Sequence, residues 1–113
     1  MGKKKDPNEV AFNKRMREIA CLRKKALKTF KNNPVASRAA DEMFDLAERL
    51  CKLARFLWKP MINDDGDEIF IYTDVARALN PKHRQLLVRQ HKVMEAYMDI
   101  LSERIALFTD GVK

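Results

Sequence analysis

Apolar residues recur at helical spacing in three long stretches of the chain, separated by short polar or proline-containing breaks. The first stretch begins near Asp6-Pro7-Asn8 and stops at Asn32-Asn33-Pro34, and the apolar arc between these limits predicts a helix with one buried face. The arc consists of Phe12, Met16, Ile19, Ala20, Ala26, Leu27 and Phe30. The first eight residues are expected to form a flexible, Lys-rich tail.

A second helix is predicted from about Ala36 to Trp58, with Ser37 as its N-cap. Its apolar residues cover about half of the circumference at 100° per residue, so this helix should touch a neighbour on each side. They are Ala39, Ala40, Met43, Leu46, Ala47, Leu50, Cys51, Leu53, Ala54 and Leu57. Phe56 is predicted to project to the polar side.

The segment after Lys59-Pro60 predicts a hairpin, with strands at 61–63 and 67–72 around an Asp64-Asp65-Gly66 turn. Residues 69–72 are apolar on both strand faces. The hairpin should therefore be sandwiched, either against Phe56 and Trp58 or against a partner chain, because an isolated hairpin is marginally stable. The acidic turn lacks the ligand spacing of a calcium-binding loop, so we read it as a solvated turn.

Thr73 is expected to cap a short helix over 74–79, and a last long helix is predicted from about Pro81 to Phe108. This helix carries an apolar stripe expected to be buried, formed by Leu86, Leu87, Val93, Met94, Tyr97, Met98, Leu101, Ile105 and Phe108. His83 and Gln90 lie on the same stripe and should be partly buried. The opposite face is basic near the start of the helix and acidic near its end.

These elements predict an all-α fold: an antiparallel bundle of three long helices, with a β-hairpin-like insert and one short helix between the second and third. With 113 residues, the chain is long enough for one domain, which we place at residues 9–113. Only three Gly and four Pro argue against a many-stranded sandwich or barrel.

The charge is unevenly distributed along the chain. The formal net charge is +7 and the pI is about 9.6. From Met1 to Pro34 eleven basic residues stand against three acidic ones, whereas from Pro60 to Asn80 one basic residue stands against five acidic ones. A basic balance of this size favours nucleic acid, an anionic surface or an acidic protein as partner.

Five cations form what we call the basic ridge, on the first predicted helix opposite its apolar arc. They are Lys14, Arg17, Lys24, Lys25 and Lys28. Cations at helical spacing can neutralise successive phosphates of a nucleic-acid backbone, which gives salt-sensitive and largely sequence-independent affinity. The alternative is a solvated face that only confers solubility. Cys21 lies within the ridge, but no catalytic base stands at a fixed spacing from it.

Residues 73–90 resemble a helix-turn-helix motif, with Ala76 at the contact between the helices, a turn at Asn80 and Leu86 at the buried position of the second helix. The resemblance implies that Arg84, Gln85 and neighbouring cations contact bases and phosphates, and Lys92 extends this set. The sequence departs from the motif because Arg89 stands where an apolar residue is expected. The alternative is an ordinary helical corner.

Enzymatic chemistry is not expected. The chain has no Ser-His-Asp grouping, phosphate-cradling Gly loop or clustered acid pair, so no cofactor is predicted. Two cysteines and two histidines fit neither a disulfide framework nor a zinc spacing. No signal peptide or membrane-spanning run is found, so we expect a soluble, cytoplasmic protein that does not bind membranes.

The sequence therefore predicts a small non-enzymatic accessory protein that binds DNA or RNA through the basic ridge, with Arg84, Gln85 and Lys92 as further contacts. The alternative is a protein-interaction module, such as a phage- or mobile-element-type inhibitor or an assembly subunit, that binds an acidic protein through Phe56, Phe70 and Tyr72. A homodimer through the hairpin or the wide second-helix arc is also expected.

Overall fold

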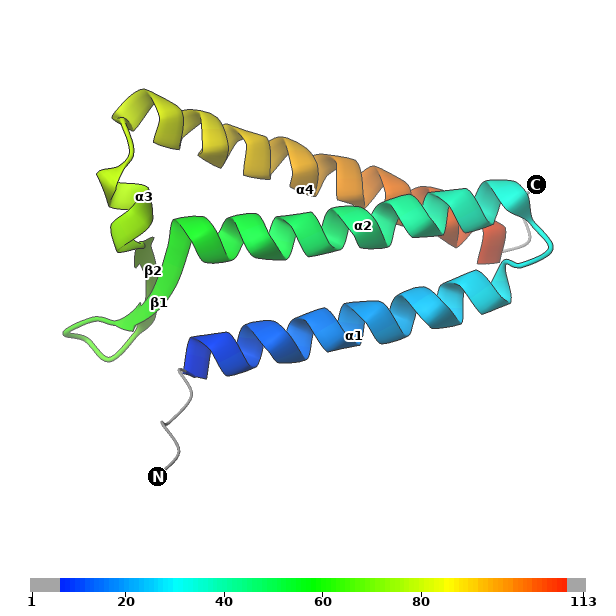
Figure 1. Ribbon diagram of the computed structural model, residues 1–113, viewed down its shortest axis with the longest axis horizontal. Helices are drawn as coiled ribbons and strands as arrows, with labels where there is room; N and C mark the ends of the chain where they lie inside the picture. Colours follow the sequence, from blue (N-terminus) through cyan, green and yellow to red (C-terminus); the bar gives the residue numbers. More distant parts are fainter. Residues whose placement is uncertain (1–6, 110–113) are drawn as a thin grey trace.

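The computed structural model describes residues 7–109. The protein is mostly helical, with four helices and one two-stranded antiparallel hairpin within that range (Figure 1). The elements are α1 (Pro7–Thr29), α2 (Pro34–Leu57), β1 (Trp58–Ile62), β2 (Glu68–Tyr72), α3 (Asp74–Ala78) and α4 (Pro81–Thr109). The order agrees with the one expected from the sequence, and the long helices end within a few residues of the predicted limits.

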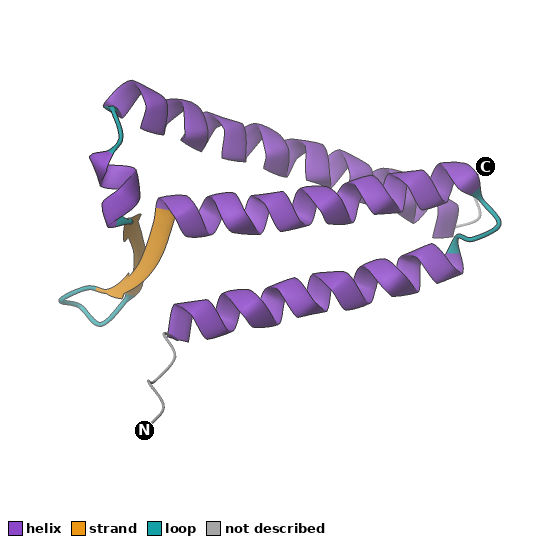
Figure 2. Cartoon of the chain, viewed as in Figure 1, coloured by secondary structure: helices purple, strands orange, loops and turns teal. Residues whose placement is uncertain are grey.

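The three long helices form an antiparallel layer in which α2 lies between α1 and α4 (Figures 1 and 2). The described chain measures 50 × 42 × 26 Å, and its radius of gyration is 17.4 Å. A compact domain of this length has a radius of gyration of about 13 Å. The predicted three-helix bundle is not confirmed, because α1 and α4 converge on each other only where Phe30 meets Phe108 and diverge toward the hairpin.

Side-chain caps define where two of the helices begin. The side chain of Asn33 accepts a hydrogen bond from the Ala36 amide at 3.1 Å, and Pro34 occupies the first turn of α2. The predicted Ser37 cap is therefore wrong, since Pro34 already suits the first turn and the helix starts three residues earlier. Thr73 caps α3 as expected, because its hydroxyl oxygen accepts from the Ala76 amide at 3.1 Å.

The hairpin follows α2 directly, and its strands pair in register from Trp58 opposite Tyr72 to Ile62 opposite Glu68. Gly66 in the turn has φ +82°, a conformation that L side chains rarely adopt. The Asn63 side chain stabilises the turn by accepting from the Asp65 and Asp67 amides. The turn chemistry predicted from Asp-Gly is thus present, and the acidic side chains around it are exposed.

A thin core lies along α2. It contains Ile19, Phe30, Ala36, Ala39, Ala40, Ala47, Leu50, Leu57, Ala76 and Leu101. The wide apolar arc predicted for α2 is confirmed, since all of its members are buried or half-buried and α2 packs on both long neighbours. The many alanines allow close approach of the helices but bury little apolar area per residue.

The prediction for α4 is wrong in part. Leu86, Val93 and Tyr97 are exposed although they were assigned to the buried stripe, and His83 and Gln90 are exposed as well. The reason is geometric: α4 has only α2 beside it for most of its length, so only the narrower stripe facing α2 is covered. The hairpin is not sandwiched within the chain either, because Ile62, Ile69 and Phe70 remain exposed.

Candidate binding site

The basic ridge lies on the outer side of α1. All five of its cations, Lys14, Arg17, Lys24, Lys25 and Lys28, are exposed. They lie on the opposite side of α1 from its buried residue, Ile19. No ion pair joins any of them to another residue in 7–109. The ridge is thus an uncompensated row of charge along one helix.

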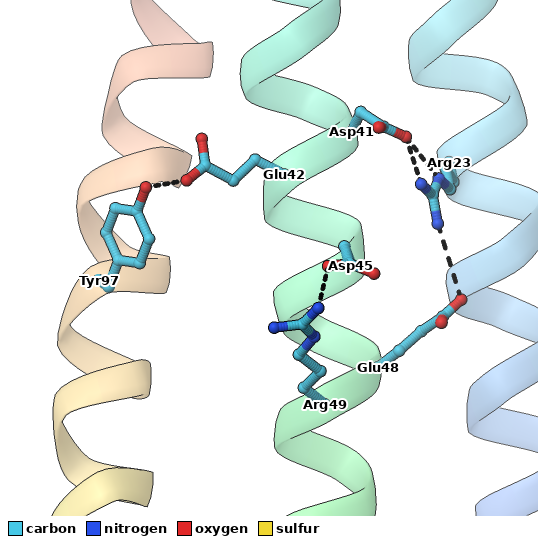
Figure 3. Close-up of polar contacts among 7 residues, drawn as sticks. All are labelled: Arg23, Asp41, Glu42, Asp45, Glu48, Arg49 and Tyr97. Carbon is cyan, nitrogen blue, oxygen red and sulfur yellow. Dashed lines mark hydrogen bonds and ion pairs between the residues drawn. The ribbon is translucent and has the colours of Figure 1, made fainter.

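Arg23, another cation of α1, pairs with carboxylates of α2 (Figure 3). Arg23 binds Asp41 of α2 through its Nε at 2.9 Å and through a second guanidinium nitrogen, and it approaches Glu48 at 4.0 Å. The hydrogen bond to Asp41 is the main cause that raises the pKa of Arg23 above its ordinary value. Arg23 therefore attaches α1 to α2 and does not belong to the free basic surface.

The second predicted set of nucleic-acid contacts lies elsewhere. Gln85 and Lys92 are exposed on α4, which α2 separates from α1, so the fold does not bring them to the basic ridge (Figure 1). Arg84 stacks over the Tyr72 ring, 4.9 Å from its centroid, and approaches the carbonyl oxygens of Ala76 and Arg77. Its guanidinium thus braces the corner between α3 and α4.

The helix-turn-helix resemblance holds at one position and fails at another. Ala76 is buried, as the motif requires. Leu86 is exposed, so its expected burial against the first helix is wrong. The short α3 packs on α2 and on the start of α4 as a corner between larger elements.

The three predicted partner-binding residues face different surroundings. Phe70 of β2 is 67% exposed, and it lines a pocket. Tyr72 is half-buried beneath Arg84. Phe56 is exposed, and its carbonyl oxygen accepts a hydrogen bond from the Thr73 hydroxyl at 2.5 Å. Only Phe70 belongs to the pocket, which leaves the other two outside it.

This pocket, which we call the aromatic pocket, lies between the start of α1, the end of α2, the hairpin and α4. Its volume is about 410 Å³, within the range of small binding sites. The lining residues are Asn8, Ala11, Phe12, Ala54, Arg55, Trp58, Pro60, Phe70 and His91. The wall is almost entirely apolar, and three aromatic rings contribute to it.

Two polar side chains at the pocket are held in place by aromatic contacts. The Arg55 guanidinium carbon lies 4.5 Å from the centroid of the Phe12 ring. The His91 ring stands edge-on to the Trp58 indole, with centroids 5.0 Å apart, and its Nδ1 lies 3.0 Å from a carboxylate oxygen of Glu95. The pocket thus combines apolar walls with a fixed cation at the rim.

A second hollow of about 450 Å³ is lined in part by Ile19 and Leu22 of α1, Phe44 of α2 and Met98 of α4. Beyond the C-terminal end of α1, Phe30 forms a buried cluster with Ala36 and Ala40, and Phe108 packs against it. This second hollow is more polar than the aromatic pocket, because Arg15, Glu95 and Asp99 also line it.

Sequence reasoning missed Phe12, Arg55, Trp58 and His91 as members of one site. Arg55 and Trp58 are close in the chain, but Phe12 and His91 come from α1 and α4, so only the fold brings the four together. The available signal was Phe56 and Trp58 close to Lys59-Pro60, which placed aromatic side chains at the junction with an apolar hairpin.

Residues 7–109 contain no group of three or more His, Cys, Asp or Glu side chains placed to hold a metal ion. None of the helices in this range has the length and apolar character required to cross a bilayer. The exposed Cys21 and half-buried Cys51 are both free thiols.

A family model described as Sequestin matches residues 33–107. The chain belongs to the Sequestin family. The Sequestin match covers α2, the hairpin, α3 and nearly all of α4, and it includes Arg55, Trp58, Phe70 and His91 of the aromatic pocket. It leaves out α1, and with it the basic ridge and Phe12. Neither the curated proteins nor the solved structures contain a match to this chain.

Proposed function

We propose that this Sequestin-family protein is a non-enzymatic interaction module that captures an apolar or aromatic group of an acidic partner protein in the aromatic pocket. The observation that carries the proposal is the pocket itself, a hollow of about 410 Å³ with aromatic walls and the Arg55 guanidinium at its rim. An apolar cavity with a few convergent polar groups is the usual form of a binding site.

The pocket chemistry supports an anchor residue flanked by negative charge. Phe12, Trp58 and Phe70 offer ring faces and edges against which an aromatic side chain can pack. Arg55 can pair with a carboxylate beside that anchor, and its stacking on Phe12 fixes the guanidinium in advance. The net charge of +7 adds long-range attraction for an acidic partner.

The extent of the family match also supports this site over the basic ridge. Six of the nine residues that line the pocket fall within the matched segment 33–107, whereas every cation of the ridge lies before it. A function held in common by the family should reside in the matched segment. That segment holds most of the residues that line the aromatic pocket.

The experiment selects a random peptide library on the immobilised full-length protein and then titrates individual enriched peptides. Trp58 is the only tryptophan, so its fluorescence reports binding in the pocket when the peptides contain no tryptophan. We expect enrichment of an aromatic or large apolar residue flanked by Asp or Glu. Phe70→Ala and Arg55→Gln should each weaken binding by about tenfold, a typical loss for an anchor contact.

Matched controls are Phe56→Ala and Arg49→Gln, which change the same residue types outside the pocket. They should leave the affinity unchanged. Enriched peptides that bind Phe70→Ala and Arg55→Gln as tightly as the native chain would overturn the proposal, as would a library that yields no peptide with an apolar anchor.

A second candidate function, nucleic-acid binding through the basic ridge, is favoured by a different observation. Five exposed cations follow one side of α1 with no carboxylate partner among the described residues. Such a row suits the phosphate backbone of DNA or RNA, and its affinity should fall steeply with salt because bound counterions are released.

Fluorescence anisotropy of short single- and double-stranded DNA and RNA at two salt concentrations tests this candidate. The triple variant Lys24→Glu/Lys25→Glu/Lys28→Glu should abolish binding. The control Arg38→Glu/Arg49→Glu/Lys52→Glu makes the same charge change on the exposed side of α2 and should only weaken it. Equal losses in both variants would indicate nonspecific attraction, and absence of binding at low salt would exclude the candidate.

A further inference from the structure

The outer side of α4 carries an apolar stripe that nothing in the described chain covers. Leu86, Val93, Ile100 and Leu107 follow one another at intervals of seven residues and are between 50% and 68% exposed. We call these four residues the outer stripe. Over 21 residues of helix it extends for about 32 Å.

A second stripe with the same spacing runs one residue further along the chain. Leu87, Met94, Leu101 and Phe108 are each buried or half-buried on the side of α4 that faces α2. Successive residues of a helix differ by about 100° around the axis. α4 thus has two separate apolar faces, of which the fold uses one.

The spacing of the outer stripe indicates that its occupant is a helix. An apolar position repeated every seven residues stays on one side of a helix, and helices that pack along their length carry core positions at this interval. A flat surface, a small ligand or a strand would not require it. Isolated surface apolar residues are common, but four in strict register along one helix form a continuous seam.

Between the apolar residues lies a second seven-residue series, Arg89, Ala96 and Glu103. All three are exposed, and neither charged member forms an ion pair with another residue of segment 7–109. Arg89 precedes Ala96 by seven residues, and Glu103 follows it by seven. This arrangement is complementary to itself when the helix direction is reversed.

We propose that the outer stripe is a homodimer interface in which two copies of α4 pack antiparallel, with Ala96 at the twofold axis. Arg89 of each copy then lies beside Glu103 of the other, and the small Ala96 side chains allow the helices to approach closely. A twofold interface places the same patch of both subunits in contact, as this pattern requires. A parallel pair would instead place Arg89 beside Arg89 and Glu103 beside Glu103, so the charges select the antiparallel arrangement.

This interface differs from the hairpin and second-helix surfaces expected for a dimer from the sequence. It is also independent of the aromatic pocket and of the basic ridge, which lie on other faces of the chain. The shape of the chain also supports a partner helix on α4. With a radius of gyration of 17.4 Å the helices form an open layer, and apolar side chains that a compact fold would bury stay exposed.

Sedimentation equilibrium of the full chain over a range of concentrations tests the proposal. We expect a mass twice the monomer's 13.2 kDa at high concentration. The variant Val93→Glu/Ile100→Glu places four carboxylates in the seam of a dimer and should raise the dissociation constant by at least about 100-fold. The control Val35→Glu/Val75→Glu makes the same change at exposed valines on α2 and α3 and should leave the dimer intact.

Charge exchange tests the direction of the helices. Arg89→Glu alone and Glu103→Arg alone should each weaken the dimer by about tenfold, because like charges then face each other. The double variant Arg89→Glu/Glu103→Arg restores opposite pairing only in the antiparallel arrangement and should recover the native dissociation constant. These exposed substitutions should keep the helical circular dichroism, which is the check that each variant is folded.

A chain that remains monomeric at all accessible concentrations would overturn the proposal. So would a dimer that is unaffected by Val93→Glu/Ile100→Glu, since it would have to form through another surface. Failure of the double charge exchange to recover affinity would overturn the antiparallel arrangement centred on Ala96.

Discussion

The imidazole ring of His91 on α4 stands edge-on to the indole ring of Trp58 at the start of β1, with their planes at 90°. This contact fastens the hairpin to α4, and it forms one wall of the aromatic pocket. The two residues are 33 positions apart in the chain, so the contact depends on the whole path through the hairpin and α3.

Replacement of His91 by alanine should loosen this wall. An aromatic pair contributes about 0.5–1.5 kcal/mol beyond the area it buries, so we expect His91→Ala to lower the free energy of unfolding by about 1 kcal/mol. The Trp58 emission should shift to longer wavelength because the indole gains contact with water. Urea unfolding followed by fluorescence measures both effects. His83→Ala, at the exposed histidine of the same helix, is the matched control and should change neither.

Local chemistry in the sequence was sufficient to predict most of the elements. The Thr73 cap, the Asp-Gly turn with Gly66 at positive φ, and the proline boundaries each depend on residues a few positions apart. The start of α2 was misplaced because Asn33 and Ser37 are both good caps, and only the hydrogen bond to the Ala36 amide distinguishes them.

The faces of α4 could not be predicted from periodicity. Leu86 and Leu87 are adjacent apolar residues, and the pattern alone assigns both to one wide stripe. Which of them is buried depends on how many neighbours the helix has, and that number is a property of the whole arrangement. The aromatic pocket was missed for the same reason, because Phe12 and His91 come together only through α2.

Tyr97 of α4 donates its phenolic hydrogen to the Glu42 carboxylate of α2 (Figure 3). This hydrogen bond is the main cause that raises the pKa of Tyr97 above its ordinary value of 10.0. The protonated phenol is favoured in the folded state, so the stabilisation is fully present below pH 10 and disappears as the pH rises through the raised pKa. Glu42→Gln should therefore lower the pKa of Tyr97 toward the ordinary value.

Ultraviolet absorbance of the phenolate during alkaline titration measures this shift. The chain has two tyrosines, and Tyr97→Phe identifies which part of the titration belongs to Tyr97. Glu48→Gln removes a carboxylate from the other side of α2 and is the control that should not move it (Figure 3). A Tyr97 titration that is the same in Glu42→Gln and in the native chain would contradict the assigned hydrogen bond.

Arg23 is the main polar link between α1 and α2, through Asp41 and Glu48. For most of its length α1 packs only on α2. Loss of the Arg23 link should therefore release α1 locally without unfolding the rest of the chain. We expect Arg23→Gln to destabilise the chain by at most about 1 kcal/mol, because the pair is partly exposed and screened by solvent. Hydrogen exchange should become faster in α1 and remain unchanged in α4.

Arg15→Gln is the matched control for this link. Its guanidinium lies 3.6 Å from Glu18 on the same helix, so this ion pair does not link α1 to α2. Equal acceleration of exchange in α1 for the two variants would show that Arg23 acts only on helix stability and not on the contact between helices.

The side chain of Leu57 is completely buried at the point where α2 passes into β1. Its carbonyl oxygen also accepts a hydrogen bond from the Thr73 amide at 2.9 Å, so the end of α2 and the start of α3 are joined there by backbone as well as by packing. Leu57→Ala removes the packing and leaves the hydrogen bond. Truncation of a buried leucine costs about 2–5 kcal/mol, the range depending on how far the cavity collapses.

Urea unfolding at a fixed protein concentration measures this loss, because the proposed dimer would make the stability depend on concentration. Leu22→Ala, at a leucine that is 47% exposed on α1, is the control and should cost less than about 1 kcal/mol. Equal stability of Leu57→Ala and Leu22→Ala would mean that packing at the junction between α2 and β1 does not contribute the main stabilisation of the core. A loss confined to Leu57→Ala, with the helix content retained, places the main packing of this thin fold where α2 meets the hairpin.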